Sequence, residues 1–156
     1  MMYMSFSRSR TRRFVLQSLY ARSIAGALVS KSAPFFEDVE RIDDTYAALL
    51  VNTILENEGK ILSVIYEYAP KFDIKTLPLI NAIILYISLT ETLILCPEDV
   101  PPRVSINEAI ELAKRYSDDP SKNLINGILN TVLEQTKIIQ TSWKTREPLA
   151  YSIFSL

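Results

Sequence analysis

Four arginines crowd the start of the chain, at Arg8, Arg10, Arg12 and Arg13, and Tyr20 follows two helical turns later. Arginine guanidinium groups bind phosphates through paired hydrogen bonds, and an exposed aromatic ring stacks on an unpaired base. A helix that carries both residue types on its surface could therefore bind a single-stranded nucleic acid. A solvated terminus and a core tyrosine are the alternatives.

Charge is divided unevenly along the chain. Residues 1–36 contain six basic residues and no acidic one, whereas residues 37–156 contain eleven basic and eighteen acidic residues. A basic segment on an acidic body is typical of proteins that contact a polyanion. A solvated N-terminus without a partner would give the same count, so charge alone does not decide between the two interpretations.

Other chemistries lack the residues that they need. The 156 residues include no histidine, one cysteine, Cys96, and three glycines. Zinc sites of cysteine and histidine, histidine-based catalytic triads and internal disulfides are therefore excluded, and no phosphate-binding glycine loop can be written. We expect no metal site and no cofactor. A lone cysteine after a start methionine, without a signal-peptide pattern, predicts a reducing, cytoplasmic location.

Paired carboxylates are the remaining candidates for catalysis. Glu108 and Glu111 share one predicted helical face, but Lys114 and Arg115 follow Glu111 at helical spacing. This pattern favours a solvated, ion-paired surface over acid–base catalysis. Asp119 is explained by helix capping. The sequence therefore predicts a protein that is not an enzyme.

The arginines precede a segment with helical periodicity. We predict a helix over residues 8–25 that buries Val15, Leu16 and Leu19, with Gly26 as its stop. Arg12 lies on the backward extension of this apolar face. Because an unpaired charge is costly to bury, we predict that the first turns project beyond the end of a helical bundle.

Further helices are predicted along the chain. The second covers about residues 37–57 and is broken at Gly59, and the third covers about residues 60–68. Residues 77–96 are long and apolar enough for a membrane span. Polar residues inside this segment, Glu91 above all, favour a buried central helix of a bundle instead.

Two start signals predict the last helices. Ser105 to Glu108 matches a capping box, and Asp119 before Pro120 matches an N-cap followed by a first-turn proline. Gly127 lies within an unbroken apolar period, which favours a close helix–helix contact there. Residues 141–156 are either a docked tail or a short final helix.

Two motifs resemble those of a known family. The first is the basic run RSRTRR at residues 8–13 leading into LQSLY at residues 16–20, and the second is DVPPRVSINEAIELAK at residues 99–114 with NGIL at residues 126–129. Together they resemble the bacterial transcription antitermination factor NusB family over roughly residues 8–136.

The resemblance implies a fold and a function. The fold would be all-α, with two side-by-side three-helix bundles and the basic N-terminal helix projecting at one end. It implies a single domain over residues 1–140, with subdomains at about 1–70 and 71–140, followed by a tail at 141–156. The function would be binding of the single-stranded boxA sequence of nascent ribosomal RNA, as a heterodimer with NusE, a small-subunit ribosomal protein, within an RNA polymerase antitermination complex.

The resemblance also implies functional residues. By motif position, the RNA-binding residues would be Arg8, Arg10, Arg12, Arg13, Tyr20, Tyr86, Lys122 and Asn123. Glu91 resembles a glutamate that faces NusE. Tyr86 stands where relatives often carry arginine, and Asn123 and Leu124 replace the usual Lys-Phe pair, so these positions depart from the family pattern.

Two other interpretations stay open at this point. One is a NusB-like helical interaction module, or a homodimer, that does not bind RNA. The other is a fragment of an enzyme, since NusB-like domains precede RNA methyltransferase domains. The absence of a glycine motif for a methyl donor and the short tail argue against the second.

Overall fold

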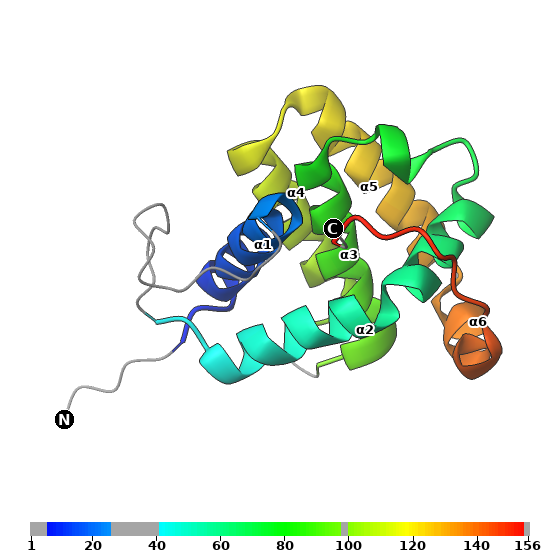
Figure 1. The fold of residues 1–156 in the computed structure, drawn as a ribbon, viewed down its shortest axis with the longest axis horizontal. Coiled ribbons are helices and arrows are strands. Elements are labelled where there is room, and N and C mark those ends of the chain that lie inside the picture. Colours follow the sequence, from blue (N-terminus) through cyan, green and yellow to red (C-terminus); the bar gives the residue numbers. More distant parts are fainter. Residues whose placement is uncertain (1–5, 26–40, 98–99, 155–156) are drawn as a thin grey trace.

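In the computed structural model, residues 6–25, 41–97 and 100–154 are described, and these residues form helices and loops without a strand. The main helices are α1 (Arg8–Ala25), α2 (Asp44–Tyr68), α3 (Leu79–Thr90), α4 (Pro102–Tyr116) and α5 (Asp119–Leu133), followed by the short α6 (Thr136–Thr141). Short helical turns lie at Ile74–Thr76, at Glu91–Leu95 and at Trp143–Thr145. The predicted all-α fold is confirmed (Figure 1).

Helix α3 is the centre of the molecule. Every residue from Asn81 to Thr90 is buried, and α3 contacts α1, α2, α4 and α5. The prediction of a buried central helix is therefore confirmed for most of residues 77–96. None of the helices in the described part of the chain is both long and apolar enough to cross a membrane.

The prediction of a break at Gly59 is wrong, because α2 continues without interruption to Tyr68. Its start is also later than predicted: Asp43 is the N-cap and accepts a hydrogen bond from the Tyr46 amide at 3.0 Å. Residues 37–40, which the prediction placed in this helix, lie outside the described residues. Gly59 has a tertiary role instead, since a Cβ there would lie 2.5 Å from the Leu149 carbonyl oxygen.

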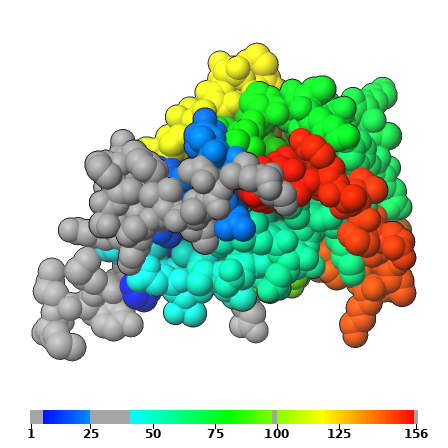
Figure 2. Space-filling view, viewed as in Figure 1, coloured from blue at the N-terminus to red at the C-terminus, as the bar shows by residue number. Residues whose placement is uncertain are grey.

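The chain that meets Gly59 belongs to an extended segment that we call the C-terminal strap (residues 146–154). The Leu149 amide donates a hydrogen bond to the Gly59 carbonyl at 3.0 Å, and the buried Glu58 carboxylate accepts from the Ile153 amide at 2.8 Å. The strap ends at Phe154, whose ring centre lies 5.7 Å from that of Tyr86. Its course over α2 is visible on the molecular surface (Figure 2).

Three other local predictions are corrected by the structure. Ser105 lies inside α4, which begins at Pro102, so it does not cap a helix. Asp118, not Asp119, caps α5, and its hydrogen bonds from Ser121 lower the pKa of the Asp118 carboxyl. Gly127 is exposed, and nothing lies within 4 Å of the position that its Cβ would take, so it makes no close helix contact.

The two glycines give a matched test of the strap. Gly59→Ala is expected to lower the free energy of unfolding by about 1–2 kcal/mol, because the added methyl group displaces backbone. Gly127→Ala is expected to raise it by about 0.5–1 kcal/mol, because alanine is the better helix former and the site is open. Urea denaturation of both variants measures the difference. Equal stabilisation by both substitutions would contradict the role assigned to Gly59.

Candidate nucleic-acid interface

The start of α1 is held against the start of α2 by hydrogen bonds. The Ser7 hydroxyl caps α1 by accepting from the Arg10 amide at 3.1 Å. The Ser7 amide in turn donates to the Arg41 carbonyl at 2.8 Å, and the Thr11 hydroxyl accepts from the Asp43 amide at 3.0 Å. The arginines of α1 are therefore presented on a backbone that is fixed at its first turn.

Arg12 is buried inside the molecule, and this corrects the prediction that the first turns project. Its side chain donates to both carboxylate oxygens of Glu91, at 2.8 and 3.0 Å, and the two residues are 2% and 1% exposed. The prediction assumed that Arg12 would lack a partner. Because Glu91 supplies one, α1 packs along the bundle, and Arg12 cannot reach RNA in this arrangement.

Glu91 receives hydrogen bonds from three helices. Besides Arg12 of α1, the Tyr46 hydroxyl of α2 and the Ser105 hydroxyl of α4 donate to its carboxylate. Burial and the adjacent Glu91 carboxylate raise the pKa of Tyr46, which keeps this phenol protonated as a donor. The implied contact of Glu91 with a partner protein is therefore corrected: its carboxylate is saturated inside the bundle.

The other three arginines of the basic run are partly exposed. Arg8, Arg10 and Arg13 each keep part of their surface in solvent, and the Arg8 guanidinium lies 3.7 Å from the centre of the Tyr46 ring. Stacking of this kind holds an arginine side chain in place. Of the four arginines, Arg12 is therefore buried, whereas the other three are partly exposed at the surface of α1.

Tyr20 lies on the exposed side of α1, with 38% of its surface accessible. Arg13, Gln17 and Tyr20 are spaced to share one helical face. Gln17 on this face donates to the Tyr116 hydroxyl at 2.9 Å, which joins α1 to the end of α4. Tyr20 therefore lies on the same side of the molecule as Arg13, as stacking on a base near a bound phosphate would require.

Tyr86 cannot contact RNA in this structure. It is 0% exposed and packs on the ring of Phe154 beneath the strap, and its burial raises the pKa of its phenol. The implied RNA-binding role of Tyr86 is therefore corrected. Tyr86 is an aromatic core residue of this chain.

Lys122 and Asn123 lie on the first turn and a half of α5, apart from the basic run of α1. Lys122 is partly exposed and lies 4.0 Å from Asp119, and Asn123 is exposed. Both side chains are accessible to a ligand. Neither residue lines the cleft that lies between α1 and α4.

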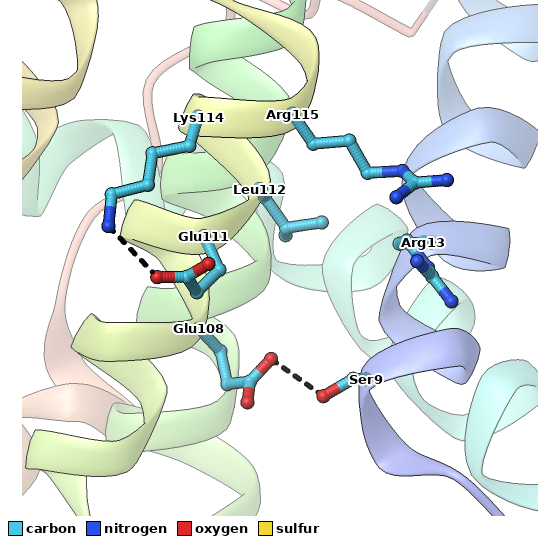
Figure 3. Close-up of a pocket in the computed structure, with 7 residues that line it drawn as sticks. All are labelled: Ser9, Arg13, Glu108, Glu111, Leu112, Lys114 and Arg115. Carbon is cyan, nitrogen blue, oxygen red and sulfur yellow. Dashed lines mark hydrogen bonds and ion pairs between the residues drawn. The ribbon is translucent and has the colours of Figure 1, made fainter. Parts of the chain in front are cut away.

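A cleft of about 450 Å³ separates α1 from α4. Seven residues of the two helices line it: Ser9, Arg13, Glu108, Glu111, Leu112, Lys114 and Arg115 (Figure 3). At one end the Ser9 hydroxyl donates to Glu108 at 2.9 Å. Glu111 and Lys114 form an exposed ion pair at 3.1 Å, as predicted, whereas Glu108 turns to Ser9 and to Arg12.

Sequence reasoning missed Arg115 as a residue of this cleft. It was assigned to a solvated surface with Glu111 and Lys114, but its side chain reaches from α4 toward α1, where Arg13 lies (Figure 3). The available signal was spacing: Glu108, Leu112 and Arg115 recur at helical intervals and so share one face of α4.

The chain is similar to known proteins over most of its length. The model of the NusB family matches residues 9–134. A transcription antitermination protein NusB of Clostridium perfringens (strain SM101 / Type A) is 38% identical over 136 residues, covering 84% of this chain and 99% of the relative. One from Chloroherpeton thalassium is 34% identical over 138 residues, covering 86% of this chain and 64% of the relative, so the chain spans less than two thirds of that relative's length.

The fold has a solved counterpart. The structure of T. maritima NusB matches with a TM-score of 0.70 and 27% sequence identity, covering 85% of this chain and 94% of that one. The family match extends from α1 through α5 and so contains Arg10, Arg12 and Arg13 of the basic run and the cleft. This chain therefore belongs to the NusB family of transcription antitermination proteins, which is not a family of enzymes.

Proposed function

We propose that this protein is an antitermination factor that binds the boxA sequence of nascent ribosomal RNA as a heterodimer with NusE. The observation that carries the proposal is the placement of Arg8, Arg10 and Arg13 on the surface of α1 while Arg12 anchors the helix from inside. An anchored helix presents its cations in a fixed array, which reduces the entropy lost when a strand binds.

Single-stranded RNA is the polyanion that this surface fits best. Guanidinium groups bind successive phosphates, and the partly exposed ring of Tyr20 offers a base a stacking surface. Lys122 and Asn123 on α5 are proposed as further, separate contacts, because both side chains are accessible. The complex would then join the RNA polymerase antitermination assembly.

NusE is expected to tighten RNA binding by roughly tenfold or more, or about 1.4 kcal/mol. The described surface of α1 offers few cations for a long strand, so the protein alone should bind boxA RNA weakly, and a second protein adds contact surface. Fluorescence anisotropy with labelled boxA RNA, with and without NusE in one buffer, measures this. Equal affinity in the two conditions would contradict the heterodimer and favour a NusB-like module that does not need this partner.

A further inference from the structure

The C-terminal strap supplies the hydrogen bonds of a buried carboxylate. Glu58 of α2 is only 8% exposed, and its two carboxylate oxygens accept from the Ser152 hydroxyl at 2.5 Å and from the Ile153 amide at 2.8 Å. No other residue in the described part of the chain donates a hydrogen bond to Glu58. Because a buried charge is costly without hydrogen bonds, this position on α2 requires donors that the helices do not provide.

The surface around Glu58 fits an extended backbone. The absence of a side chain at Gly59 leaves room for the strap, and the Gly59 carbonyl accepts from the Leu149 amide at 3.0 Å. Tyr86 of α3 packs its ring on that of Phe154, the one residue of the strap that is buried. Acceptors for backbone amides beside a slot for one side chain are the features by which proteins bind extended peptides. We call this surface the strap groove (Glu58, Gly59 and Tyr86).

The strap is an addition to a bundle that has its own core. Helices α2 and α3 lie inside the family match, which ends at residue 134, whereas the strap lies outside it. The strap crosses one face of the molecule (Figure 2), and its Leu149 and Tyr151 side chains remain 40% and 37% exposed. Segments with few buried contacts open at a low cost in free energy. We therefore expect the strap to leave its groove without unfolding the helices.

The residues before the docked part of the strap form an exposed, extended hinge. Arg146 follows a short helical turn and has extended backbone angles, φ −67° and ψ 130°, and Glu147 and Pro148 are exposed. Proline disfavours helical backbone at the residue before it, so Glu147 continues the extended path. At about 3.3 Å per residue, residues 147–154 span up to about 26 Å, which is long enough to reach a second molecule alongside the first.

We propose that the strap of one chain docks in the strap groove of a second copy, so that two chains exchange straps in a reciprocal dimer. A second copy is the partner that the groove fits, because its strap carries the same Ser152 hydroxyl, Ile153 amide and Phe154 ring. Exchange rebuilds every contact of the closed chain. Since an attached strap has an effective concentration in the millimolar range, wild type should be about half dimeric at roughly 1 mM. The inference does not depend on RNA binding.

Two full-length variants separate the strap from the groove. Gly59→Leu fills the groove with a side chain and keeps the strap, and leucine suits this helical position. Phe154→Ala keeps the groove and removes the ring that anchors the strap. In a mixture, the strap of the Gly59→Leu chain should dock on the Phe154→Ala chain. Analytical ultracentrifugation at roughly 0.1 mM of each chain, below the effective concentration of an attached strap, should show a 1:1 dimer in the mixture and a monomer for each variant alone.

Matched controls assign the association to the strap. Adding Phe154→Ala to the Gly59→Leu chain should weaken its association with the Phe154→Ala chain by about tenfold or more, because the aromatic anchor is lost. Adding Leu49→Ala instead, at an exposed site of α2 outside the groove, should leave the association unchanged. If Phe154→Ala does not fold, Ile153→Pro replaces it, since this change removes only the amide that donates to Glu58.

Three results would overturn the exchange of straps. The first is a mixture that stays monomeric although circular dichroism shows both chains to be folded. The second is a dimer that forms equally well when both chains lack the Phe154 ring, because the association would then use another surface. The third is wild type that stays monomeric at roughly 1 mM, since the strap would then be a fixed brace of its own chain.

Discussion

Replacing Arg12 by alanine is expected to lower the free energy of unfolding by about 3–5 kcal/mol, because it leaves a buried carboxylate without its cation. Glu91 is 1% exposed and takes two of its hydrogen bonds from Arg12. The hydroxyls of Tyr46 and Ser105 would remain as donors, but neither carries a positive charge. Urea denaturation measures the change, with the exposed Arg103→Ala variant as a control that should shift stability by less than about 0.5 kcal/mol.

A paired substitution identifies the cause of this loss. If the penalty comes from an unpaired buried charge, the double variant Arg12→Met with Glu91→Leu should be more stable than Arg12→Ala, since neither charge is then buried. A loss in Arg12→Ala no larger than that in Arg103→Ala would contradict the ion pair between α1 and Glu91. If the double variant is less stable than Arg12→Ala, the larger loss comes from the Tyr46 and Ser105 hydroxyls, which no longer have the Glu91 carboxylate as an acceptor.

The triple substitution of Arg8, Arg10 and Arg13 by alanine is expected to weaken boxA RNA binding by about 10²–10³-fold in the presence of NusE. Each exposed guanidinium–phosphate hydrogen bond contributes about 1.5 kcal/mol or somewhat less to the free energy of binding. This corresponds to a change in affinity of up to about tenfold for each arginine. The fold should persist, because alanine is the best helix former and Arg12 still holds α1 to Glu91. Anisotropy at one low salt concentration measures the loss.

The control for this variant uses the same type of residue elsewhere. Arg103→Ala removes one exposed arginine of α4 that lies outside the cleft and the α1 surface, and should change RNA affinity less than threefold. If the triple variant binds RNA as tightly as Arg103→Ala does, the surface arginines of α1 are not the RNA contacts. Circular dichroism should show the same helix content in all three proteins.

The helical elements could be predicted from the sequence because their apolar periodicity is local information. Val15, Leu16 and Leu19 are buried as the period indicates, and so is almost all of α3. The prediction of a helix break at Gly59 is wrong. This glycine lies within α2, and its lack of a side chain leaves room for the backbone of the strap at Leu149. Asp119 was predicted as the N-cap because it directly precedes Pro120, and this is wrong because Asp118 caps α5.

The candidate site was predictable only in part, because partners distant in sequence decide which charges are buried. Periodicity placed Arg12 on the extension of the apolar face of the first helix, but nothing local supplies a partner for its charge. That partner is Glu91, 79 residues away, which lies opposite Arg12 once α3 is in place. The role of Tyr86 depends in the same way on Phe154, in a strap beyond the family match.

The central claim is that the surface arginines of α1 bind RNA phosphates, and a salt titration tests it most directly. For single strands, the slope of log affinity against log salt falls by about 0.7 for each phosphate contact. With Arg12 buried, three contacts remain on α1, so wild type should have a slope about 2 units steeper than the Arg8, Arg10 and Arg13 triple alanine variant, both saturated with NusE. Coincident slopes would contradict the account, because the basic start of α1 would then contribute no phosphate contacts.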